Sequence, residues 1–234
     1  MTSVTPGSEA GDSSRDRTRW TAIVLAGQRP GADPMAAHCN VEHKALIPIG
    51  GQTMLERVAR ALIASPGVSR IVVMAQVPEE LKAGLPLDLA EREEIAFARS
   101  GDGIATSIHA VAGTGVAPWP VLVVAVVERK TMLSAYPDAR RTWLKFRGGA
   151  YSGANLFALA NAAARPALAL WSGVEQDRKK GWKIFARFGP WLMLRALSRT
   201  ISFEDAMAEA GKRMALRAEP IVLPIAEAAI DVDK

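Results

Sequence analysis

The segment Thr21–Pro48, with the sequence TAIVLAGQRPGADPMAAHCNVEHKALIP, decides the fold class of this chain. It opens with an apolar run, Ala22–Leu25, whose β-branched members predict a strand buried on both faces. Gly27 follows, at a point where the backbone can approach another group closely. Because ligands of open α/β sheets bind beyond the carboxyl ends of the strands, we expect a binding site at this loop.

Two basic residues suggest what this loop binds. Arg29 carries a planar guanidinium that can hold two phosphate oxygens, and Lys44 adds a mobile point charge. Amide groups of the loop can complete an anion site. A strand followed by a solvated arginine and an ordinary turn explains the same residues, so the pattern by itself leaves both interpretations open.

The whole segment resembles the opening of the MobA-like nucleotidyltransferases, which transfer a nucleoside monophosphate from an NTP to a phosphorylated acceptor and release pyrophosphate. The residues that match the family's first loop are Leu25, Ala26, Gly27, Arg29, Lys44 and Pro48. The resemblance implies that the first three bind the nucleotide. It also implies that Arg29 and Lys44 are catalytic, holding the NTP phosphates and offsetting the charge of the leaving pyrophosphate. Gln28 stands where many relatives have a second Gly.

A Gly-rich loop, Ser100–Ser107, opens a predicted helix and gives a second match. As a bare pattern it is an ordinary turn before a helix, whose N-terminus favours a nearby anion. It also resembles the family segment that holds the base and ribose of the nucleotide. The resemblance implies nucleotide contacts from Gly101, Gly103 and Ser107.

A third match, Tyr151–Phe157, resembles a loop with Gly and Asn that faces the acceptor in the family. Asn155 can both donate and accept hydrogen bonds, as recognition of a sugar or pterin-like group requires. Asn is equally common as a cap of the helix or turn that follows, so both roles stay open.

The magnesium site of the resembled family is damaged in this sequence. Pro120–Lys130 is one fused apolar run, and because joining parallel strands takes about a dozen residues or more, it has room for one strand only. In the family a strand like Val121–Val124 ends in an Asp that binds Mg2+. Here the chain passes directly into Ala125, and we assign Glu128 to a different element. The resemblance places the second Mg2+ ligand at Asp231, where a polar chain end is an equally ordinary explanation.

Strands and helices alternate before residue 120, which predicts a parallel sheet. Thr53–Glu56 has the form of a helix-capping box. Further strands are expected at Arg70–Ala75, Glu94–Ala98 and Glu219–Ile225, and helices within Pro78–Glu94 and at Pro166–Gln176, Trp182–Leu197 and Phe203–Leu216. The strands at Ala22–Leu25, Ile71–Met74 and Val121–Val124 should be neighbours. The predicted fold class is α/β: a mostly parallel sheet flanked by helices, as in a Rossmann-like nucleotidyltransferase, with a helix-rich C-terminal half.

Length and composition favour one domain. At 234 residues and 49% hydrophobic content, the chain can bury a substantial core. We place the domain at residues 20–234 and expect residues 1–19 to be a disordered leader. No apolar run reaches the roughly 20 residues that cross a bilayer, so we expect no membrane partner. Cys39 is the only cysteine, which favours the cytoplasm. Its spacing from His38 and His43 matches no familiar metal-ligand pattern.

The charge balance favours anionic ligands, with 29 Lys and Arg against 24 Asp and Glu. Two basic clusters begin at Arg140 and Arg178, and solvent-exposed helix faces or strand edges explain most of their residues. The spacing of the neighbouring aromatic residues suits side chains that anchor an element in the core. Nucleic acid is therefore not favoured as a partner. The missing Asp leaves open a nucleotide-binding module with little or no turnover. A nicotinamide oxidoreductase and a P-loop NTPase are disfavoured, because the first loop lacks G-x-G-x-x-G and no G-K-[ST] occurs.

Overall fold

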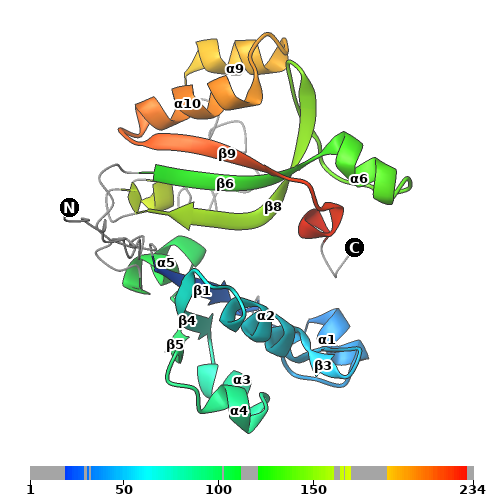
Figure 1. The fold of residues 1–234 in the computed structure, drawn as a ribbon, viewed down its shortest axis with the longest axis vertical. Coiled ribbons are helices and arrows are strands. Elements are labelled where there is room, and N and C mark those ends of the chain that lie inside the picture. The colour runs from blue at the N-terminus through cyan, green and yellow to red at the C-terminus, as the bar shows by residue number, and fades with distance from the viewer. Residues whose placement is uncertain are drawn as a thin grey trace, which may run out of the picture. The chain divides into compact units, whose positions relative to one another are not determined.

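The computed structural model describes residues 19–28, 31, 33–101, 103–111, 121–160, 164–165, 167–169 and 189–230 (Figure 1). The chain divides into two compact units, Met1–Arg99 and Ser100–Lys234. Each unit has its own sheet and its own core, and they are described in turn. Arg29, Asp102, Asp231, the leader up to residue 18 and the second basic cluster lie outside the described residues.

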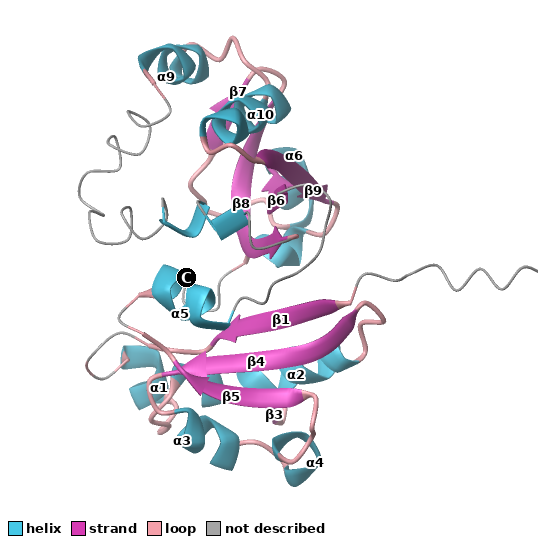
Figure 2. Cartoon of the chain, turned by 90° about the vertical axis from the view of Figure 1, so that its left-hand side faces the viewer, coloured by secondary structure: helices cyan, strands magenta, loops and turns pink. Residues whose placement is uncertain are grey.

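The first unit is built on a parallel sheet with the strand order β1-β4-β5. Its strands are β1 (Trp20–Leu25), β4 (Val68–Ala75) and β5 (Ile95–Arg99). Figure 2 shows them side by side, and because both β1 and β5 run parallel to β4, the three carboxyl ends meet at one edge. The predicted strands are therefore confirmed. The predicted burial of Ala22–Leu25 on both faces is wrong: β1 pairs only with β4 and is half-exposed, whereas central β4 is buried over its last five residues.

The first unit also contains short helices and a hairpin. They are α1 (Pro34–His38), η1 (Lys44–Leu46), the hairpin β2 (Pro48–Ile49) and β3 (Gln52–Thr53), α2 (Met54–Ile63), α3 (Pro78–Ala83) and α4 (Leu87–Ala90). The predicted cap of α2 is confirmed, because the Thr53 hydroxyl accepts a hydrogen bond from the Glu56 amide at 3.1 Å. Helices α2 and α3 pack on β4. Buried side chains from both, including Leu55 and Leu81, join Val73 in one hydrophobic core.

The second unit has a mixed sheet with the order β7-β8-β6-β9. Its strands are β6 (Val121–Glu128), β7 (Leu144–Phe146), β8 (Gly149–Leu159) and β9 (Arg217–Leu223). Figure 1 shows β6 between β8, which is antiparallel to it, and β9, which is parallel. The prediction of a single strand in the fused run is confirmed. The prediction that Val121–Val124 neighbours β1 and β4 is wrong, because β8 and β9 occupy the hydrogen-bonding edges of β6.

Helices of the second unit are α5 (Ile104–Val111), α6 (Arg129–Ala135), α9 (Pro190–Leu197), α10 (Phe203–Arg213) and the short η4 (Ala226–Ala229). The predicted start of α10 is confirmed, since the Ser202 hydroxyl accepts a hydrogen bond from the Asp205 amide at 3.1 Å. Residues 170–188, which hold much of two predicted helices, lie outside the described ranges. The described part of this half includes four strands, so a helix-rich C-terminal half is not confirmed.

Tyr151–Phe157, predicted to be a loop, is instead part of strand β8. The Tyr151 ring stacks on Phe203 at a centroid distance of 4.8 Å, and both residues join Val126 in a buried cluster. This packing holds the segment in the sheet even though glycine and asparagine interrupt its pattern. Among the helices that the structure describes, none is long and apolar enough to cross a membrane.

Candidate functional site

The loop after β1 leaves a backbone donor open at the carboxyl edge of the first sheet. The Ala26 amide donates to the Met74 carbonyl at 2.9 Å, so the loop still follows β4 for one residue beyond the strand. The next amide, that of exposed Gly27, has no hydrogen-bond partner among the described residues. Leu25, the last residue of β1, is also exposed. An amide in this position is available to an anion such as a phosphate.

Gln28 ties this loop to two distant parts of the chain. Its backbone amide donates to Gln76 Oε1 at 3.1 Å, just beyond the end of β4. Its side-chain Nε2 donates to the Glu42 carbonyl at 3.0 Å, while its Oε1 accepts from the Lys44 amide at 3.1 Å. One side-chain amide therefore binds both a carbonyl and an N–H group of the Lys44 segment. As a result, the start of η1 lies next to the β1 loop.

The hydrogen bonds of Gln28 to Gln76, Glu42 and Lys44 are called the Gln28 brace below. Gly27 is closely packed against the Gln76 side chain of this brace. A Cβ atom at this position would lie 2.9 Å from Gln76 Oε1, the same atom that accepts the Gln28 amide. A larger residue would have to displace the Gln76 side chain. The close approach predicted for Gly27 is thus present, and its partner is a glutamine side chain.

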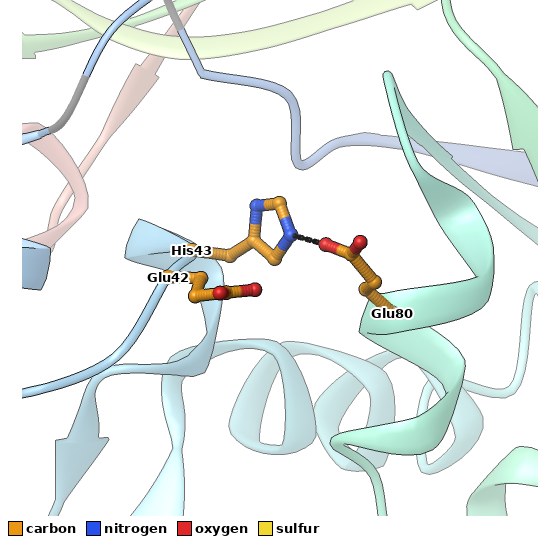
Figure 3. Close-up of side chains that lie close together, drawn as sticks. All are labelled: Glu42, His43 and Glu80. Atoms are coloured by element: carbon orange, nitrogen blue, oxygen red, sulfur yellow. Dashed lines mark hydrogen bonds and ion pairs between the residues drawn. The ribbon is translucent and has the colours of Figure 1, made fainter.

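A contact between His43 and Glu80 holds the segment before Lys44. Figure 3 shows His43, which precedes η1, pointing to Glu80 on α3, and Nε2 of the imidazole lies 2.5 Å from Glu80 Oε2. The His43 side chain is only 13% exposed. Together with Glu42, these residues offer ligand atoms within 4.8 Å of one another, the one such group found in the described part of the chain. The contact anchors His43, and with it the backbone of Lys44, to α3.

In the second unit, the loop before α5 is closed by its own hydroxyl groups. The Gly101 amide donates to Ser107 Oγ at 2.9 Å, and this hydroxyl donates to the Gly103 carbonyl at 2.7 Å. The Gly103 amide donates to Thr106 Oγ1 at 3.1 Å. Ser107 is 2% exposed, so its hydroxyl makes these loop hydrogen bonds from a buried position. Nucleotide contacts from Gly101, Gly103 and Ser107 stay predictions.

Asn155 lies within β8, where the sheet is irregular. The pairing of β8 with β6 shifts register between Val124 and Val126, opposite this residue. Asn155 adopts a φ of 53°, a left-handed conformation that Asn tolerates better than most residues. Its exposed position within a strand shows that it does not cap a helix. Its proposed role toward the acceptor stays a prediction.

Two carboxylates of the second unit, those of Glu128 and Glu227, each contact another protein side chain. Glu128 is the last residue of β6, which corrects our assignment of it to another element, and its carboxylate lies 2.8 Å from Lys130 Nζ. Glu227, in the η4 turn after β9, accepts a hydrogen bond from the Tyr136 hydroxyl at 2.7 Å. Mg2+ usually takes one or two carboxylates together with substrate phosphates. Because Glu128 and Glu227 both engage protein groups, the described residues here do not fit a preformed magnesium site.

Comparison with known proteins relates the chain to a hypothetical transferase of known structure. No protein-family model and no curated protein matches it. A hypothetical transferase from Thermus thermophilus is 27% identical, covers 92% of this chain and 97% of its own, and superposes with a TM-score of 0.70. A more distant structure, CMP:2-keto-3-deoxy-manno-octonic acid synthetase with CTP, is 11% identical over 87% of this chain and 89% of its own, with a TM-score of 0.45.

The Thermus structure shares the α/β fold over nearly the whole chain, while the MobA-like family itself is not confirmed. Sequence reasoning missed the Gln28 brace and the contact of His43 with Glu80. Gln28 did stand out as a departure from the resembled family. The signal available in the sequence was a glutamine, whose side chain has two N–H donors and an oxygen acceptor, at a position where many relatives have glycine.

Proposed function

We propose that this chain is a nucleotidyltransferase, which transfers a nucleoside monophosphate from an NTP to a phosphorylated acceptor and releases pyrophosphate. The observation that carries the proposal is the Gln28 brace, which joins the open Gly27 loop to the segment of Lys44. The similarity to a hypothetical transferase over nearly the full chain supports it. So does the resemblance of Thr21–Pro48 to the opening of the MobA-like enzymes.

In the proposed reaction, an oxygen of the acceptor phosphate attacks the α-phosphorus of the NTP. A new P–O bond forms, the bond from the α-phosphorus to the bridging oxygen breaks, and pyrophosphate leaves with the electron pair. Catalysis of this kind depends on positioning and on charge stabilisation. The Gly27 amide, Arg29 and Lys44 bind the phosphates and offset the developing negative charge.

The remaining parts of the substrates are assigned by the same resemblance. Leu25 and Ala26 border the nucleotide, Gly101, Gly103 and Ser107 belong to the base and ribose site, and Asn155 faces the acceptor. Bound Mg2+ would cancel phosphate charge. The proposed ligand, Asp231, lies outside the described residues, and the carboxylates of Glu128 and Glu227 are engaged elsewhere. No step of the reaction is therefore assigned to the ion.

A second candidate is a nucleotide-binding module with little or no turnover. The specific observation that favours it is the ion pair of Glu128 with Lys130, because this carboxylate ends the strand at which the resembled family carries an Mg2+ ligand. Such a chain binds an NTP but transfers its nucleoside monophosphate slowly or not at all.

Two measurements distinguish these candidates. The first is thermal stabilisation of the full chain by each of the four NTPs, since a ligand that binds the folded state raises its melting temperature. The second is pyrophosphate release with Mg2+ and a panel of sugar phosphates and molybdopterin-type acceptors. A nucleotidyltransferase shows stabilisation and acceptor-dependent release, whereas a binding module shows stabilisation alone. If no NTP stabilises the chain, both candidates are wrong.

A further inference from the structure

The second unit contains a pocket of about 490 Å³ that the proposed nucleotide chemistry does not use. Its lining residues are Ala139, Arg140, Arg141, Thr142, Trp143 and Ser152. The first five belong to the segment that joins α6 to β7, and the last belongs to β8. Small-molecule sites commonly have volumes of about 300 to 1,000 Å³, so one small ligand fits.

The position of Ser152 places this pocket next to the carboxyl ends of the parallel strands β6 and β9. Ser152 pairs with Val127, the residue before the last of β6, and Val127 also pairs with Leu223, the last residue of parallel β9. Ligands of sheets with parallel strands bind beyond their carboxyl ends. The pocket is therefore beside the end of the parallel pair at which a ligand is expected.

Ser152 also offers a polar group that the protein leaves unused. The residue is 5% exposed, and its hydroxyl has no hydrogen-bond partner among the described residues. The Ser152 oxygen is not among the fully buried unpaired polar atoms of the described residues, so it is accessible from the pocket that the residue lines. A hydroxyl in this position can both donate to and accept from a bound ligand.

The charge of the lining indicates an anion. Arg140 and Arg141 both line the pocket, and no acidic residue is among the lining residues that the structure describes. Within the described residues, Arg140 makes no ion pair or hydrogen bond. Guanidinium groups bind phosphate through two parallel N–H donors, and the repulsion between two neighbouring cations falls when an anion lies between them. Thr142 adds a second hydroxyl.

Trp143 gives the pocket an apolar wall. It packs against a cluster that contains Val127, Met132, Ala226 and Ala229, so the indole is held in place from behind. Large aromatic side chains of this kind supply apolar contact area at low entropic cost, because they have few rotatable bonds. A ligand with a ring next to its anionic group can use both parts of the pocket.

We propose that this pocket binds a small organic phosphate. Arg140 and Arg141 hold the phosphate, Ser152 and Thr142 hydrogen-bond to hydroxyl groups, and Trp143 packs against a ring such as that of a sugar. The inference rests on the pocket alone and does not require nucleotidyl transfer. If the chain does catalyse that transfer, a ligand of this class matches the phosphorylated acceptor.

The test is isothermal titration of the full chain with glucose 1-phosphate, inorganic phosphate and glucose. We expect the sugar phosphate to bind at least tenfold more tightly than either fragment. The double variant Arg140→Ala/Arg141→Ala should weaken its binding by tenfold or more, and Ser152→Ala by about threefold to tenfold. Arg147→Ala is the matched control, because Arg147 is exposed, pairs with Asp205 and does not line the pocket.

Each other outcome overturns the proposal. No binding of glucose 1-phosphate, or unchanged binding in the double arginine variant, shows that the pocket is not this site. Inorganic phosphate that binds as tightly as the sugar phosphate shows an anion site without a ring subsite. Stabilisation by NTPs is measured in the same samples. If it persists while sugar-phosphate binding is absent, this inference fails and the proposed nucleotide site stands.

Discussion

The side-chain oxygen of Gln28 accepts a hydrogen bond from the backbone amide of Lys44 at 3.1 Å. The same side chain donates to the Glu42 carbonyl, so it fixes the chain on both sides of His43. His43 is in turn held by Glu80 on α3. These contacts fix the backbone of residues 42–44 relative to Gln28. A phosphate bound at the Gly27 amide would therefore lie one residue from the side chain that holds this segment.

Replacing Gln28 by alanine should weaken NTP binding. The variant leaves the Lys44 amide and the Glu42 carbonyl without their partner, so the segment loses its fixed position relative to the β1 loop. Two hydrogen bonds of about 0.5 to 1.5 kcal/mol each correspond to a loss of roughly fivefold or more in affinity. Calorimetric titration with the best-stabilising NTP measures it. Gln52→Ala, in the β2–β3 hairpin, serves as the control. Equal NTP affinities in wild type and Gln28→Ala would show that the Gln28 hydrogen bonds do not contribute to NTP binding.

Replacing Gly27 by alanine should also weaken NTP binding, with a small loss of thermal stability. The added Cβ would lie 2.9 Å from Gln76 Oε1, so the Gln76 side chain must move and its bond to the Gln28 amide is lost. Gly67→Ala is a matched control, because a Cβ there would meet Trp20 at an ordinary 3.6 Å. The two variants are compared by melting and by titration. An equal effect of both substitutions would show that the Gly27 contact has no special role.

Glu128→Gln should change neither NTP affinity nor turnover. The Glu128 carboxylate is paired with Lys130, so a metal ion would have to displace this lysine to bind it. We therefore expect slow pyrophosphate release by the wild-type chain and the same rate in the variant. Glu219→Gln, which removes a carboxylate paired with Arg217, is the control. Robust Mg2+-dependent turnover that Glu128→Gln abolishes would show that Glu128 leaves Lys130 and binds the ion.

The Tyr136–Glu227 contact predicts that part of the folding stability depends on pH. The hydrogen bond from the Tyr136 hydroxyl lowers the pKa of Glu227 from its ordinary value of 4.5. A carboxyl whose pKa is lower in the folded state stabilises the fold above its unfolded-state pKa, and this contribution is lost as the pH falls through the folded-state pKa. Tyr136→Phe should raise the pKa of Glu227, and its destabilising effect should shrink in acid.

Carboxyl NMR titration and urea unfolding at several pH values test this prediction. The pKa of Glu94, which is lowered by its own backbone amide and by Arg92, should not change in Tyr136→Phe and is the internal control. A pKa of Glu227 that is the same with and without the Tyr136 hydroxyl would disprove the link.

Local signals in the sequence were enough for part of the fold. The last five residues of strand β4, Ile71–Ala75, are a continuous apolar run, and the Thr53 cap depends on a residue only three positions away. Strand β8 was not predictable in this way. Gly153 and Asn155 interrupt it, and its place in the sheet depends on pairing with β6 and on the packing of Tyr151 against Phe203.

The candidate site shows the same limit. The position of Gly27 at a strand end could be predicted from neighbouring residues. The role of Gln28 depends on Glu42, Lys44 and Gln76, which lie 14, 16 and 48 residues away along the chain. Such contacts exist only once the sheet and η1 have formed, so a single sequence shows the glutamine without its partners.

Calorimetric titration of Arg29→Ala and Lys44→Ala measures whether the loop after β1 binds an NTP. A charge-assisted phosphate contact is worth about 1.5 to 3 kcal/mol, so each variant should lose roughly tenfold or more in NTP affinity while melting like the wild type. Lys82→Ala, on the exposed side of α3, should bind normally. Wild-type affinity in both Arg29→Ala and Lys44→Ala would contradict the account.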